Sequence, residues 1–99
     1  SYQAYQEILD EILKVLIDKG IGLECNTAGF KYGLGHPNPT EEILLRYRQL
    51  GGEILTLGSD GHAPEHLAYD FEKAGDLLKA CGFRYYTIFK NRKPEFHKL

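Results

Sequence analysis

The sequence predicts an α/β protein in which helices alternate with parallel strands. Three stretches carry apolar residues at three- and four-residue spacing, which is typical of helices packed on a core. Each stretch ends at a glycine and is followed by a short run with strand character. The repeated order of helix and strand favours parallel strands joined by right-handed crossovers. We therefore expect residues 1–99 to form a single unit.

The first helix and strand occupy the N-terminal quarter of the chain. Gly20 supplies the helix stop, and residues 21–26 alternate apolar with small or polar side chains, as a strand does. One face of this strand is expected to pack on helices, and the other carries Glu24 and Asn26. The helical stripe consists of Ile8, Leu9, Ile12, Leu13, Leu16 and Ile17.

The second helix follows a long segment, 27–39, that is rich in Gly, Pro and Asn and is expected to be a loop. Loops of this length are usually functional or disordered. Thr40 is a suitable N-cap, and Gly51 and Gly52 end the helix. Residues 54–58 are nearly all apolar, which indicates a short strand of a parallel sheet covered on both faces.

The third helix begins at Pro64, which suits a first helical turn, and Gly82 closes it. Residues 85–89 are β-branched and aromatic, as strands prefer. The tail, 90–99, is expected to contain a turn around Pro94 and one further short strand. The buried side of the third helix is expected to consist of Phe71, Ala74, Leu77, Leu78 and Cys81.

Composition excludes several classes of protein. A net charge of −2 gives no support for nucleic-acid binding, which requires a basic face. No apolar run approaches the roughly 20 residues that a membrane span needs. Residues 1–5 lack the pattern of a signal peptide, which favours a cytoplasmic setting. Cys25 and Cys81 are interpreted as buried reduced thiols, with a metal-ligand role for Cys25 as the alternative.

The residues best suited to chemistry follow two of the predicted strands. Asp60 and His62 come directly after the second strand. They are two residues apart, so their side chains face the same way if the backbone is extended. Carboxylate and imidazole suit Zn, Mn or Fe. A plain Ser-Asp-Gly turn is the alternative. Asn26 ends the first strand, and the carboxyl ends of parallel strands open onto the same side of a sheet, where function collects.

Two segments resemble histidinol phosphatases of the PHP (polymerase and histidinol phosphatase) family. Residues 23–33, LECNTAGFKYG, are similar to the family stretch L-E-[IV]-N-[TS]-[SA]-G-x-[RK]-x-G. Residues 50–62, LGGEILTLGSDGH, are similar to L-G-G-x-[IV]-[VL]-T-x-G-S-D-A-H. Residues 81–85 and 92–94 match the end of such chains. The resemblance runs in order over nearly all of the sequence.

This resemblance implies that the chain is the C-terminal part of a distorted (β/α)7 barrel. Such enzymes hydrolyse phosphate monoesters at a multinuclear centre of divalent metal ions, and histidinol phosphatase releases phosphate from L-histidinol phosphate in histidine biosynthesis. Asp60 and His62 match the last two metal ligands and are the expected catalytic residues. An earlier H-x-H ligand motif has no counterpart here, and a barrel takes roughly 250 residues. The chain would therefore supply about the last third.

The substrate-binding candidates are Asn26, Lys31 and Arg92, each with a plainer alternative. Asn26 could simply cap its strand end. Lys31 stands where many relatives carry Arg and would hold phosphate as a point charge, unless it is a solvated loop residue. Arg92 could face phosphate or belong to a solvated basic turn. Glu24 could line the barrel interior, but it is expected to be a buried structural carboxylate. His36 could approach a substrate, and His66 could form a helical metal pair with His62, but both are expected at the surface.

The expected partner is a small phosphate ester, with neither nucleic acid nor membrane. Two other functions stay open: a different PHP phosphoesterase, and a non-catalytic PHP-like module that serves structure or interaction. Strands cut from a barrel leave an open sheet edge and exposed apolar surface. We therefore expect the isolated chain to self-associate and to lack phosphatase activity.

Overall fold

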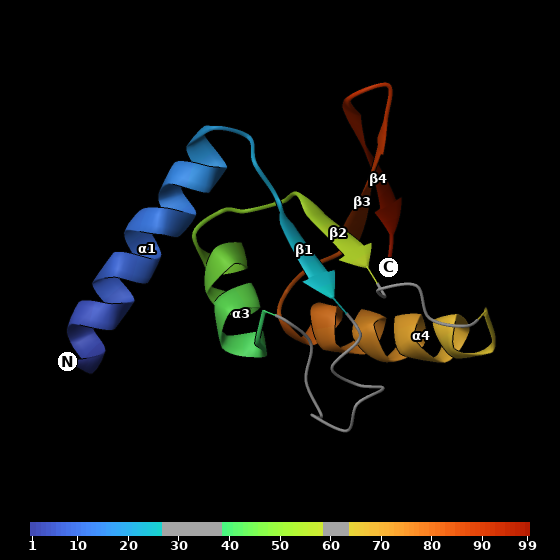
Figure 1. Cartoon of the computed structure of the whole chain (residues 1–99), viewed down its shortest axis with the longest axis horizontal. Coiled ribbons are helices and arrows are strands. Elements are labelled where there is room, and N and C mark those ends of the chain that lie inside the picture. The colour runs from blue at the N-terminus through green and yellow to red at the C-terminus, as the bar shows by residue number, and fades with distance from the viewer. Residues whose placement is uncertain (27–38, 59–63) are drawn as a thin grey trace.

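A computed structural model of the chain describes residues 1–26, 39–58 and 64–99. The elements in chain order are α1 (Tyr2–Asp18), β1 (Leu23–Asn26), α3 (Glu41–Gln49), β2 (Leu55–Gly58), α4 (Pro64–Ala80), β3 (Tyr85–Lys90) and β4 (Lys93–Lys98). Figure 1 shows β1 and β2 side by side at the centre, with α1 and α3 to one side, α4 below, and the β3–β4 hairpin projecting upward. The predicted mixed α/β fold is confirmed.

β1 and β2 form a parallel pair. Their register runs from Leu23 opposite Leu55 to Asn26 opposite Gly58. The pairing begins one residue before β2, where the Leu23 N–H donates to the Ile54 carbonyl at 3.0 Å. Both strands therefore end at the same edge of the sheet, as the sequence predicts.

The hydrophobic core lies where α1, α3 and α4 meet one face of this pair. Its members come from these helices and from both parallel strands, so the core joins segments that lie far apart in the sequence. Both cysteines belong to it as free thiols, which confirms their predicted role. The buried cluster consists of Leu13, Cys25, Leu44, Tyr47, Leu55, Leu78, Cys81 and Phe83.

The helix ends follow the predicted signals, with one exception. Gly20, Gly51 and Gly82 lie just beyond the three helices and have positive φ angles of 69°, 101° and 97°, which side chains other than glycine adopt at a cost. α3 begins after Thr40 as expected, but the Thr40 side chain makes no capping hydrogen bond. The acidic residues of the first turn complement the helix dipole there instead.

The C-terminal region departs from the predicted parallel pattern. β3 pairs with β4 in antiparallel fashion, from Tyr85 opposite Lys98 to Lys90 opposite Lys93. The turn lies at Asn91 and Arg92, whose φ angles are 51° and 64°, and not around Pro94. Two successive positive φ angles match the right-handed twist of a tight hairpin. Pro94 sits inside β4, which is tolerated in an edge strand because one side needs no N–H donors.

The hairpin is joined to the parallel pair through a side chain. Thr87 of β3 is 2% exposed, and its Oγ1 accepts a hydrogen bond from the backbone N–H of Leu55 at 3.1 Å. This contact satisfies a buried donor on β2 where no β2–β3 ladder supplies a carbonyl. In the part of the chain that the structure describes, no helix is long and apolar enough to cross a membrane.

Candidate metal and substrate site

The β1–β2 pair has one apolar face and one polar face. Leu23, Cys25 and Leu55 point to the core side. The alternate residues form the other side, here named the polar face: Glu24, Asn26, Thr56 and Gly58. A parallel sheet covered by helices on both faces is apolar on both. The expectation that β2 is buried on both faces is therefore wrong, because Thr56 and Gly58 are half-buried.

Asn26 lies where a strand-end site requires it. It is the last residue of β1, half-buried, and directly opposite Gly58, the last residue of β2. Asp60 and His62 follow Gly58 in the sequence but lie outside the described residues, as does Lys31. The structure thus shows the common edge at which β1 and β2 end, next in sequence to both predicted segments.

Glu24 lies on the polar face, as the sequence predicts, but its expected burial is wrong. It was expected as a buried structural carboxylate, but its side chain is exposed. The carboxylate leans across β2: a β-carbon at Gly58 would collide with Glu24 Oε1 and lie 3.0 Å from its Cδ. Glu24 therefore reaches toward the carboxyl ends of the strands. The polar and apolar alternation of β1 placed Glu24 on this face, as the sequence predicts; only its burial was wrong.

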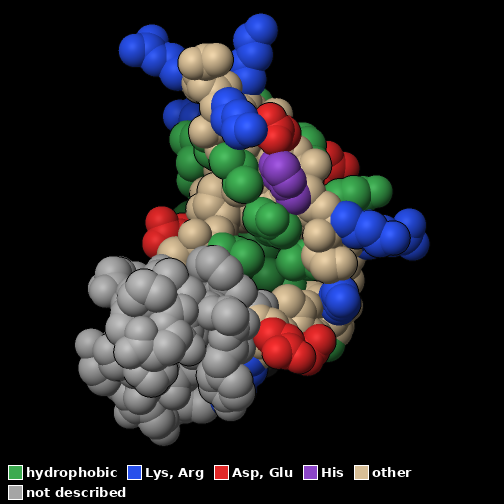
Figure 2. Space-filling model, turned by 90° about the vertical axis from the view of Figure 1, so that its right-hand side faces the viewer, with side chains coloured by type: hydrophobic (Ala, Val, Ile, Leu, Met, Phe, Trp, Pro, Cys, Tyr) green, Lys and Arg blue, Asp and Glu red, His purple; other side chains and the backbone are tan. Residues whose placement is uncertain are grey.

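Arg92 is placed apart from these residues. It occupies the exposed turn between β3 and β4, and Figure 1 shows this turn well away from the ends of β1 and β2. Figure 2 shows basic side chains gathered at that tip, above a patch of apolar side chains. In this structure Arg92 and Asn26 do not approach each other.

Among the described residues, no group of three or more His, Cys, Asp or Glu side chains could hold a metal ion. His36 and His62 lie outside the described residues, and the side chain of His66 does too. Burial raises the pKa of the Cys25 thiol to about 11, helped by the nearby Cys81 and Glu41. Cys25 is fully buried in the core cluster, on the side of β1 away from the polar face, so the structure does not favour the metal-ligand alternative for Cys25.

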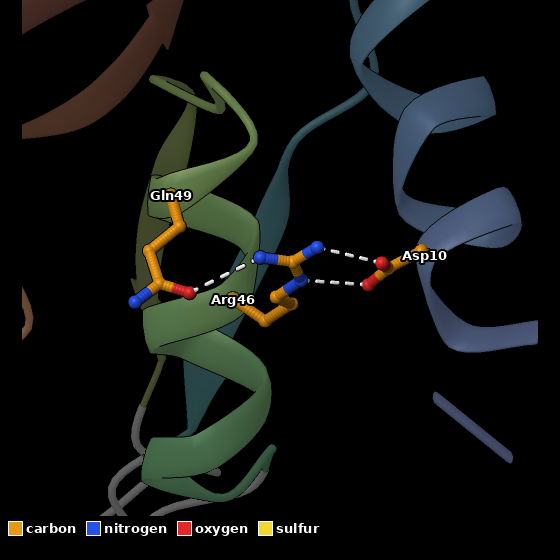
Figure 3. Close-up of polar contacts among 3 residues, drawn as sticks. All are labelled: Asp10, Arg46 and Gln49. Carbon is orange, nitrogen blue, oxygen red and sulfur yellow. Dashed lines mark hydrogen bonds and ion pairs between the residues drawn. The ribbon is translucent and has the colours of Figure 1, made fainter. Parts of the chain in front are cut away.

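Two polar contacts hold α3 against its neighbours and so position the start of β2. Arg46 of α3 binds Asp10 of α1 at two points, Nε to Oδ1 at 2.7 Å and Nη2 to Oδ2 at 2.6 Å (Figure 3). Its third nitrogen donates to Gln49 at 3.4 Å. The Tyr47 hydroxyl donates to the Ile54 carbonyl at 2.9 Å, the carbonyl that also accepts from β1. These contacts anchor α3 to α1 and to the start of the parallel pair.

Comparison with known proteins gives one consistent result. No protein-family model matches the chain. A probable histidinol-phosphatase of Thermotoga maritima is 36% identical over 89 residues, which are 89% of this chain and 37% of that protein. The histidinol-phosphatase of Lactococcus lactis is 33% identical over 96 residues, 94% of this chain and 34% of that protein.

A solved structure agrees with these sequences. The crystal structure of histidinol phosphate phosphatase from Lactococcus lactis, complexed with zinc, L-histidinol and phosphate, matches with a TM-score of 0.69 and 29% identity. The match covers 96% of this chain and 36% of that one. The chain spans about a third of the length of these relatives, which fits the expectation of a C-terminal piece of a longer enzyme. By sequence and by fold, the chain is similar to about a third of the length of these histidinol phosphatases.

Proposed function

We propose that the full-length parent of this chain is a metal-dependent phosphatase that converts L-histidinol phosphate into L-histidinol and phosphate. The observation that carries the proposal is the common edge of β1 and β2, where Asn26 lies opposite Gly58 and the segment with Asp60 and His62 follows at once. The relatives bear the name of this activity, and the Lactococcus lactis structure holds zinc, L-histidinol and phosphate.

Each predicted residue has a role in this proposal. Asp60 and His62 supply a carboxylate and an imidazole, a donor set that suits divalent zinc, manganese or iron. The bound metals would orient the phosphate, neutralise developing charge and lower the pKa of bound water. Asn26 and Lys31 would hold the substrate beside them. Arg92 would join them only if the complete parent places the hairpin turn near the strand ends.

The remaining metal ligands would come from the part of the parent that this chain does not contain. We propose that the parent closes into a distorted (β/α)7 barrel, with the polar face of β1–β2 on its interior. Support comes from the face itself, since polar side chains on a parallel sheet are expected where the sheet lines a site and not where a helix covers it. The two free thiols suit a reducing compartment, for which we propose the cytoplasm.

The test is phosphate release from L-histidinol phosphate by the full-length parent loaded with Mn²⁺ or Zn²⁺. Asp60→Ala is expected to reduce turnover by at least about 100-fold and to lower the amount of bound metal. Asp76→Asn is the matched control, because Asp76 is an exposed carboxylate on α4. A well-folded, metal-loaded parent without turnover would refute the proposal and direct attention to other phosphate esters.

We also propose that the 99-residue chain by itself self-associates and is inactive. The outer side of α1 carries an apolar stripe with spacing of three and four residues: Tyr5, Ile8, Ile12 and Val15 are 52%, 59%, 53% and 49% exposed. Such a stripe is typical of a helix that packs against a partner. Light scattering at two concentrations should detect association that weakens in an Ile8→Glu, Ile12→Glu variant. A strictly monomeric chain at high concentration would contradict this.

A further inference from the structure

Glu24 carries the charge on the polar face of the parallel pair. Its neighbours Leu23 and Cys25 belong to the core side, whereas the Glu24 carboxylate is exposed on the side of Asn26 and Thr56. Within the described ranges, Glu24 forms no ion pair with a cationic side chain. Among the described residues, no cationic side chain gives this carboxylate a structural ion pair.

The Glu24 carboxylate lies over Gly58, the residue opposite Asn26. Gly58 does not have a positive φ angle, so its backbone conformation does not call for glycine. A β-carbon at Gly58 would meet the end of the Glu24 side chain, with Cδ at 3.0 Å and Cγ at 3.5 Å. The exposed Glu24 carboxylate therefore lies over Gly58, the last residue of β2, and extends toward the carboxyl ends of the strands.

From this geometry, and resting on the function proposed above, we infer that Glu24 determines specificity for phosphate esters that carry an amine. The carboxylate would accept charge-assisted hydrogen bonds from the substrate ammonium group. Metals that hold the phosphate cannot distinguish one monoester from another. A negative charge at the same strand edge attracts a cationic substrate and repels an anionic one, and this attraction strengthens when substrate excludes water.

The inference predicts a change that depends on the substrate. In the metal-loaded full-length parent, Glu24→Gln should lower kcat/KM for L-histidinol phosphate about 10- to 100-fold, mainly through KM, as expected for a lost hydrogen bond to a charged group. For the analogue without the amino group, 3-(imidazol-4-yl)propyl phosphate, kcat/KM should change by less than about 2-fold. Glu24→Asp keeps the charge and should lose less than Glu24→Gln.

Two controls separate this role from others. Bound metal, measured by mass spectrometry, should be unchanged in Glu24→Gln. Glu53→Gln removes an exposed carboxylate just before β2, at the opposite end of the strand pair. This variant should leave kcat/KM unchanged for both substrates. An equal loss on both substrates, or a loss of bound metal, would overturn the inference and leave the proposed phosphatase intact. A wild-type parent that hydrolyses p-nitrophenyl phosphate but not L-histidinol phosphate would overturn both.

Discussion

Replacing Tyr47 by phenylalanine tests how α3 is attached to the parallel strands. Tyr47 is 1% exposed, and its ring stacks with Phe83 at a centroid distance of 6.3 Å. The ring also covers Gly52, where a β-carbon would collide with it. Its hydroxyl donates to the Ile54 carbonyl at 2.9 Å. The side chain thus combines a buried aromatic contact with one hydrogen bond to the start of β2.

The two parts of the side chain should contribute different amounts to the free energy of unfolding. Tyr47→Phe keeps the ring, and the Ile54 carbonyl keeps its second donor, the Leu23 N–H at 3.0 Å. The expected loss is therefore that of one ordinary hydrogen bond, about 1 kcal/mol. Tyr47→Ala also removes the ring and leaves a cavity, for which we expect about 3–5 kcal/mol.

Urea unfolding of the 99-residue chain, followed by far-UV circular dichroism, would measure both losses. For a chain of this size, 1 kcal/mol corresponds to a shift of about 4–8 °C in Tm. The experiment should be repeated at two protein concentrations, because self-association stabilises the folded state by mass action. Equal losses of unfolding free energy in Tyr47→Phe and Tyr47→Ala would refute the separate contributions of ring and hydroxyl. No loss in Tyr47→Phe would refute the contribution of the hydroxyl.

Two further predictions concern pH. Arg46 lowers the pKa of Asp10, chiefly through its hydrogen bonds, so this stabilisation is present above the unfolded-state pKa, near 3.8, and is lost as pH falls below it. Asp10→Asn should lower the urea midpoint at pH 7 and not at pH 2; a difference that is the same at both pH values would contradict this. Burial raises the pKa of Cys25 from 9.0 to about 11, so its contribution is complete below about pH 9 and is lost as pH rises toward 11. The free energy of unfolding should fall across that interval, less steeply in Cys25→Ala, and Ellman's reagent should label neither cysteine of the folded chain at pH 8.

The sequence alone determined the features that depend on local patterns. Apolar residues at helical spacing located α1, α3 and α4, because a helix buries one stripe wherever it packs. Glycines located the helix ends, since the positive φ angles there suit glycine best. The two segments around Asn26 and Asp60 indicated a resemblance to histidinol phosphatases, and the similar proteins bear that name. The roles of Asp60, His62 and Lys31 stay predictions.

Tertiary structure decided how the strands pair and which side chains meet. The run 85–89 has strand character whichever neighbour it takes, so only non-local hydrogen bonds made it half of an antiparallel hairpin. Asn91 and Arg92 lack the glycine that usually marks such a turn. The exposure of Glu24 likewise depends on what faces β1 across space, and its contact with Gly58 depends on the β1–β2 register. The periodicity of apolar residues determines locally which face of a helix or strand is buried. Which strands pair depends on contacts between segments that are distant in the sequence.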